Sequence, residues 1–209
     1  MKKKFSLSML LTAVAMVLII ACGVKLQAKA TDYYYNEDYN NGDAGQAVKY
    51  AITSYDDKTC QAIGCKSSAT SITIVAYPVI NGETYTCTSI AKNAFKGNKK
   101  LKTVKISASA SKITTIPEGC FQNCTNLTSV YLDNTKLKSI GKKAFYNCKK
   151  LTTLSIKSTK ITKSNIKTNA FKNVSNLKVY GKTKAYAKKL AKWIAARGGS
   201  VATYAKISS

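Results

Sequence analysis

The residues of this chain that could do chemistry are seven cysteines and nine acidic residues, because the sequence contains no histidine. Without histidine the commonest general base is missing, and neither a Ser-His-Asp nor a Cys-His arrangement can be built. Glu83, Glu118 and Asp133 are far apart, which disfavours a pair of catalytic carboxylates. No glycine-rich phosphate loop occurs. The sequence therefore predicts a protein that is not an enzyme and has no cofactor.

The cysteines allow two interpretations. Apart from Cys22 there are six, and an even number in an exported chain suggests disulfides. Cys60 and Cys65 are the best candidate bridge, across an expected hairpin loop, with free thiols throughout as the alternative. Cys124 and Cys148 share one column of a repeat, so we expect them to be small buried core residues. No metal site is expected, because no close Cys-x-x-Cys pair exists.

The first thirty residues have the pattern of an export signal. Three lysines precede an uncharged run from Phe5 to Ala21, which is short for a transmembrane anchor. Cleavage between Ala30 and Thr31 would release the protein, and we favour it. The alternative is a lipobox ending at Cys22, which would be lipidated and would hold the protein at the membrane. Residues 1–30 are therefore predicted to be a signal peptide.

The charge is strongly positive and uneven. The formal net charge is +25, but residues 31–47 contain four acids, four tyrosines and no base. We expect this stretch to be a flexible acidic tether, because it has neither helical nor strand periodicity. Arg197 is the only arginine, which argues against specific nucleic-acid recognition. A solvated lysine surface is the simplest interpretation, and anionic cell-wall polymers are the favoured polyanionic partners.

Three columns of apolar residues recur along the chain with one shared spacing. The steps between successive members are 26, 24 and 26 residues in every column. A unit of this length cannot bury its own apolar face, so neighbouring units must stack. The columns are Phe95, Phe121, Phe145 and Phe171; Leu101, Leu127, Leu151 and Leu177; and Ile90, Ile116, Ile140 and Ile166.

Within each unit a short strand is expected, because Leu101, Val104 and Ile106 fit the pattern L-x-x-L-x-L. The units resemble the BspA-type leucine-rich repeats of bacterial surface proteins, which follow I-x-x-I-x-x-x-A-F-x-x-C-x-x-L-x-x-V-x-I. Residues 113–132 and 137–156 match nearly throughout, apart from Cys120 where alanine is usual. The resemblance implies a solenoid on exported, often adhesive proteins, and it implies no single ligand.

The predicted fold is an α+β repeat solenoid with a parallel strand ladder. About four leucine-rich coils are expected over residues 88–181. An N-terminal β cap is expected over 48–87, with a hairpin turn at Asn81-Gly82. Residues 182–209 are expected to form a C-terminal cap, with a helix from Lys184 to Arg197 and a last short strand.

The face presented by the strands is the candidate binding surface, because solenoids usually bind there. Hydroxyls, one tyrosine and mixed charges suit an extracellular protein or glycan, and ordinary solvent-facing residues without a partner are the alternative. We therefore expect a secreted or surface-attached binding module. A structural protein of the producer's envelope, held by lysines or by a lipidated Cys22, is the second hypothesis. The candidate residues are Thr103, Lys105, Ser129, Tyr131, Asp133, Thr153, Ser155 and Lys157.

Overall fold

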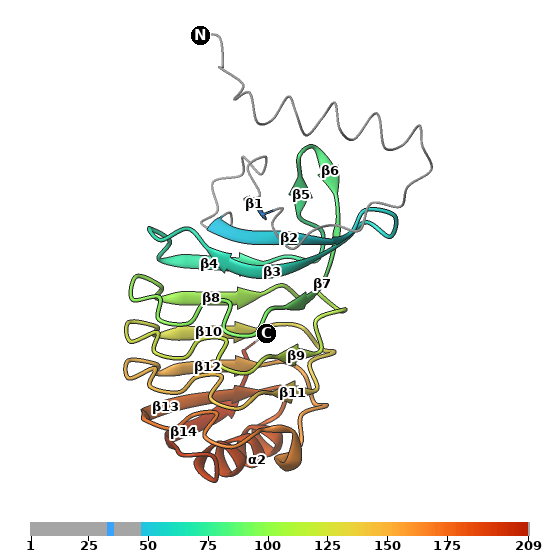
Figure 1. Ribbon diagram of the computed structural model, residues 1–209. Helices are drawn as coiled ribbons and strands as arrows, with labels where there is room; N and C mark the ends of the chain where they lie inside the picture. Colours follow the sequence, from blue (N-terminus) through green and yellow to red (C-terminus); the bar gives the residue numbers. More distant parts are fainter. Residues whose placement is uncertain (1–32, 36–46, 209) are drawn as a thin grey trace, which may run out of the picture.

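The computed structural model describes residues 33–35 and 47–208, which form a stack of coils (Figure 1). Its main sheet is a ladder of six parallel strands in the order β14-β13-β12-β10-β8-β4. On the side where each coil returns, β9 and β11 pair in parallel as a second, smaller sheet. The strands of these two sheets are β4 (Ser71–Ile74), β8 (Thr103–Ile106), β9 (Thr115–Ile116), β10 (Ser129–Leu132), β11 (Ser139–Ile140), β12 (Thr153–Ile156), β13 (Val174–Gly181) and β14 (Gly199–Lys206).

The repeat columns of the sequence become columns of buried side chains. Alternate residues of each ladder strand point inward, and Val104, Val130 and Leu154 are in register and fully buried. The four phenylalanines stack one above another, with ring centroids 5.1, 5.4 and 5.2 Å apart. Each coil therefore completes its core only with the coils beside it, as expected for a solenoid.

The turns that contain the phenylalanines use left-handed backbone at two positions per coil. One position is occupied by Gly97, Asn123, Asn147 and Asn173, with φ between 62° and 75°. Glycine and asparagine tolerate this conformation better than other residues. The Asn147 side chain also donates a hydrogen bond to the Asn123 side chain at 3.1 Å, which joins neighbouring turns.

The N-terminal end contains a separate four-stranded sheet in the order β1-β2-β3-β7. The hairpin predicted at Asn81-Gly82 is present, with φ of 52° and 79° at the two turn residues. Two expectations need correction. β4 lies in the region expected to be a cap, but it pairs in parallel with β8 and belongs to the ladder. The strands of this end are β1 (Tyr33–Tyr35), β2 (Val48–Ser54), β3 (Thr59–Cys65), β5 (Val79–Ile80), β6 (Glu83–Thr84) and β7 (Thr86–Ile90).

The second correction concerns the predicted flexible tether. Residues 33–35 form β1, which pairs antiparallel with β2, so this part of the tether is a strand. The remaining tether residues, except Ala47, lie outside the described residues, as do the signal peptide, the Ala30-Thr31 cleavage site and Cys22. In the described part of the chain, no helix is long and apolar enough to cross a membrane.

At the other end of the stack, helix α2 (Lys184–Ala195) packs against β13 and β14 (Figure 1). Its N-terminus is capped by Thr183, whose hydroxyl accepts a hydrogen bond from the Tyr186 N–H at 3.1 Å. The predicted apolar stripe is confirmed, since its members are all buried: Ala187, Leu190, Ala191 and Ile194. A short 3₁₀ helix, η2 (Lys163–Asn165), precedes the last coil.

Candidate functional site

The outer face of the ladder brings the predicted binding residues together. One outward column begins each strand and contains Thr103, Ser129 and Thr153. A second column contains Lys105, Tyr131 and Ser155. Asp133 and Lys157 follow β10 and β12 directly, at equivalent places. All eight predicted residues therefore belong to three adjacent coils and lie on one surface, called here the ladder face.

Asp133 links these coils by charge. Its carboxylate lies 3.1 Å from the Lys157 ammonium group and 3.7 Å from the Lys105 ammonium group. The side chain of Asp133 is only 14% exposed, whereas both lysines are about half exposed. Exposed ion pairs contribute only ~0–1 kcal/mol each to stability. Their consequence for the ladder face is that ammonium groups from the two neighbouring coils are held beside Asp133.

The second outward column has an aromatic side chain on either side of a small residue. The register places Ser155 between Tyr131 on β10 and Tyr180 on β13. Tyr131 is 38% exposed, whereas Ser155 is 7% exposed. Ser155 is therefore hardly accessible to a ligand, although it lies in the predicted column. Tyr180, which the sequence analysis did not select, is half-buried next to it.

A hollow of about 300 Å³ opens where the ladder strands end. Lys157 lines it together with Thr135, Lys182 and Ile207. It is therefore next to the Asp133–Lys157 ion pair and continues the ladder face. Its lining comes from residues distant in the sequence, which the register of β10, β12, β13 and β14 brings together.

The repeats that form these coils also identify the protein family. The pattern described as BspA type leucine rich repeat region matches residues 65–181 in six copies. The chain belongs to the BspA-type leucine-rich repeat family. The matched region begins before residue 88, the expected start of the repeats, and it includes β4.

The solved structures that resemble this chain include two bacterial leucine-rich repeat proteins. A leucine rich cell surface protein from Faecalibacterium prausnitzii A2-165 is 23% identical with a TM-score of 0.52, over 79% of this chain and 42% of that chain. A leucine-rich repeat protein from Bacteroides ovatus is 20% identical with a TM-score of 0.42, over 68% of this chain and 47% of that chain. This chain therefore spans less than half of either protein, and the first likeness supports the fold alone. No curated protein matches the sequence.

The predicted Cys60–Cys65 disulfide is wrong. Both residues belong to β3, and an extended strand separates residues five positions apart by about 16 Å, whereas a disulfide needs Cα atoms within about 7 Å. Cys60 instead lies opposite Cys87 on the parallel strand β7, and both are buried free thiols. The interaction with the neighbouring Cys87 sulfur, together with burial, raises the pKa of the Cys60 thiol.

The cysteines of the BspA-type repeat column are core residues, as predicted. Cys124 and Cys148 are fully buried, and each thiol donates to the carbonyl oxygen of the preceding turn, Phe95 or Phe121, at 3.0 Å. Burial raises the pKa of Cys124 to about 12. Such thiols are poor nucleophiles, because the thiolate is the reactive form.

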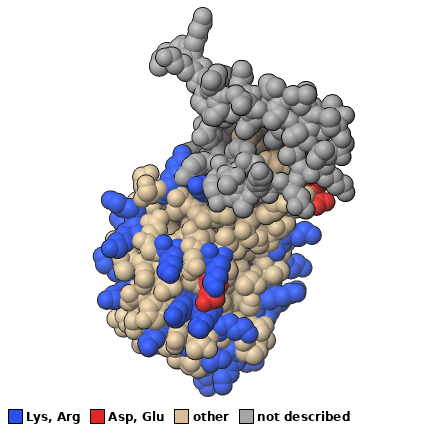
Figure 2. All heavy atoms as spheres, viewed as in Figure 1, with Lys and Arg blue, Asp and Glu red and all other residues tan. Residues whose placement is uncertain are grey.

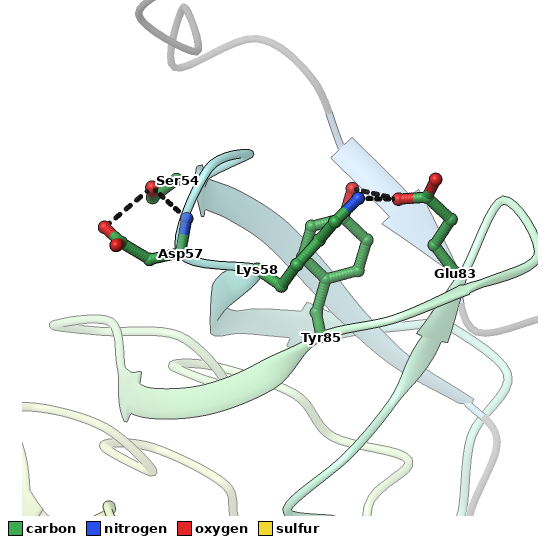
Figure 3. A network of polar contacts seen from close by, with 5 residues as sticks. All are labelled: Ser54, Asp57, Lys58, Glu83 and Tyr85. Atoms are coloured by element: carbon green, nitrogen blue, oxygen red, sulfur yellow. Dashed lines mark hydrogen bonds and ion pairs between the residues drawn. The ribbon is translucent and has the colours of Figure 1, made fainter.

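Two acidic residues of the N-terminal unit, Asp57 and Glu83, contact a hydroxyl or a lysine. Figure 3 shows Lys58 and the Tyr85 hydroxyl converging on the Glu83 carboxylate, while Asp57 accepts a hydrogen bond from Ser54 at 2.9 Å. Lys58 lies in the turn between β2 and β3, so its ion pair ties that turn to Glu83 at the start of β6. Among the described residues, no group of three histidine, cysteine or acidic side chains could hold a metal ion.

Basic side chains dominate the surface of this BspA-type solenoid. Figure 2 shows basic side chains spread over the visible face of the described residues, with few acidic side chains among them. The sequence analysis treated this as one general property. It missed a local concentration at the first turn, where Lys96, Lys99 and Lys100 line a second hollow. The signal for it was present, since only the first unit has lysine at all three of these positions.

Proposed function

We propose that the chain is an exported, non-catalytic binding module whose ladder face contacts an extracellular protein or glycan. The observation that supports this most directly is the cluster of Tyr131 with the Lys105–Asp133–Lys157 ion pairs on three successive coils. An exposed aromatic ring next to fixed charges can stack on a sugar or pack against a protein side chain while the charges set the orientation. The leucine rich cell surface protein of similar fold is consistent with a place on the cell surface.

The experiment measures retention of the purified protein on host extracellular matrix and on bacterial cells, at low and high salt. Tyr131→Ala is compared with the wild type, and Tyr77→Ala is the matched control, because Tyr77 is 61% exposed and lies outside the ladder. We expect salt-resistant binding to matrix that Tyr131→Ala loses and Tyr77→Ala keeps. Equal binding by both variants would refute a site on the ladder face.

The net charge of +25 supports a second candidate, a structural protein held in the producer's own envelope by lysines on anionic polymers. Attraction between exposed charges is screened over ~10 Å at 0.1 M salt. This candidate therefore predicts binding to bacterial cells that disappears at high salt and is unchanged in the Tyr131→Ala variant. The two candidates give opposite results in the same experiment.

Whether the protein is secreted or anchored to the membrane needs a separate measurement. Mass spectrometry of the N-terminal peptide from the producing cells distinguishes release from anchoring. A mature N-terminus at Thr31 means a secreted protein, as we propose. A diacylglyceryl group on Cys22 would mean a membrane-anchored lipoprotein instead.

A further inference from the structure

A second hollow, of about 490 Å³, lies between the end of β3 and the first phenylalanine turn. Cys65 lines it from β3, and the turn contributes Phe95, Lys96 and Asn98. The Asn98 side chain donates to the Cys65 sulfur at 3.1 Å and accepts from the Leu101 N–H at 3.1 Å. Asn98 is therefore held at the edge of the hollow by β3 and by its own turn. None of the residues that line this hollow belongs to the ladder face.

The turns of successive coils are joined by a regular pair of backbone hydrogen bonds. The carbonyl oxygens of Cys120 and Gln122 accept from the N–H groups of Phe95 and Gly97, at 2.9 and 2.7 Å. The donors and the acceptors are each two residues apart. The next two turns repeat the pair, with Ala144 and Tyr146 accepting from Phe121 and Asn123, and with Ala170 and Lys172 accepting from Phe145 and Asn147.

The equivalent oxygens of the first turn belong to Ala94 and Lys96. Within the described part of the chain, no hydrogen bond reaches either oxygen. The element beside this turn is the extended strand β3 and not another turn, and it donates no N–H group to either oxygen. Gly64 of β3 lies next to the Ala94 oxygen, and a Cβ atom at Gly64 would be only 3.2 Å from it. The first turn thus presents two acceptors that every later turn has filled.

The charge of this hollow is positive. Lys96, Lys99 and Lys100 line it, and no acidic side chain is among its lining residues. The third unit has the equivalent lysines Lys149 and Lys150, but its turn acceptors are already filled by the preceding coil. Unfilled backbone acceptors and a lysine cluster therefore coincide at the first turn.

We propose that this hollow binds an extended acidic peptide segment of a partner protein. The segment would donate two main-chain N–H groups, two residues apart, to the oxygens of Ala94 and Lys96. Its carboxylates would pair with Lys99 and Lys100. A peptide fits better than a phosphate polymer or an acidic glycan, because alternating backbone N–H groups match acceptors spaced two residues apart. Edge pairing of this kind gives affinity through the backbone and specificity through the charges.

The test uses the full chain and a fluorescent peptide of about ten residues with alternating glutamate and alanine, measured by fluorescence anisotropy. A second peptide has the same sequence with every other backbone nitrogen methylated, so that it keeps the charge and loses the donors. Lys99→Gln/Lys100→Gln is compared with Lys149→Gln/Lys150→Gln, which removes the same charge from the equivalent positions of another coil. Dextran sulfate serves as a competing polyanion without peptide N–H groups.

We expect the Lys99/Lys100 variant to lose about fivefold in affinity, and the Lys149/Lys150 variant to bind like the wild type. The methylated peptide should bind about tenfold more weakly, because two hydrogen bonds are lost. Equal losses in the two lysine variants, equal binding of the two peptides, or full displacement by dextran sulfate at equal charge would each overturn the proposal. Tyr131→Ala should leave peptide binding unchanged. The experiment can therefore refute the peptide site at the first turn without bearing on the ladder-face site, and the reverse also holds.

Discussion

The phenylalanine stack predicts that the cost of removing a ring depends on its place in the stack. Phe145 lies between two rings, at 5.4 and 5.2 Å, and is fully buried. Phe95 has one stacked neighbour, at 5.1 Å, and its position lines the hollow next to β3. Truncating a buried phenylalanine to alanine costs ~3–5 kcal/mol, and each aromatic contact adds ~0.5–1.5 kcal/mol beyond area burial.

We therefore expect Phe145→Ala to lower the free energy of unfolding by about 4–5 kcal/mol and Phe95→Ala by about 3 kcal/mol. Urea unfolding followed by circular dichroism measures both values, and the m value reports whether the whole stack still unfolds together. If the first coil detached from the stack before the rest unfolded, the m value of Phe95→Ala would be reduced. An equal or larger loss for Phe95→Ala, with unchanged m values, would refute the view that stacked coils share their core.

Two further predictions concern a turn residue and a pair of cysteines. Lys143 has a φ of 55° at a turn position where other coils have asparagine or glycine, so Lys143→Asn should raise the free energy of unfolding by about 1 kcal/mol. Lys142→Asn is the control and should have little effect in the same urea assay. Refolding with oxidised glutathione should join Cys60 to Cys87, with a mass loss of ~2 Da and a gain of about 3–4 kcal/mol from closing a loop of roughly 28 residues. Peptide mapping that finds Cys65 in the crosslink instead would contradict the register of β3 and β7.

The repeat itself was predictable, because periodic burial leaves a periodic sequence. The phenylalanine, leucine and isoleucine columns predicted the parallel ladder and its register, and the buried column of Cys124 and Cys148 followed from them. The boundary at the N-terminal end was not predictable. Ile72 and Ile74 alternate with polar residues as they would in an antiparallel strand, and only pairing with β8 shows that β4 belongs to the ladder.

The site was predictable only as a set of positions. Alternation along each strand placed Tyr131 and Lys105 on the outer face, but alternation does not reveal neighbours across strands. Ser155 is covered because two large side chains flank it, and Asp133 pairs with lysines 28 and 24 residues away in the sequence. The Cys60–Cys65 error has the same origin, since sequence proximity was used where strand pairing decides the distance.

The backbone–backbone hydrogen bonds that join the phenylalanine turns all point the same way, so their dipoles are aligned along the stack. In each of these bonds the N–H group points towards the following coil, and the accepting carbonyl points towards the preceding one. The peptide dipoles of the turns therefore add along the stack, with their negative ends at the first turn, in the manner of a helix dipole. Ammonium groups of Lys96, Lys99 and Lys100 lie at that negative end. At the opposite end the Phe171 N–H donates to the Arg197 carbonyl just beyond α2, so this donor of the last turn is bonded within the chain.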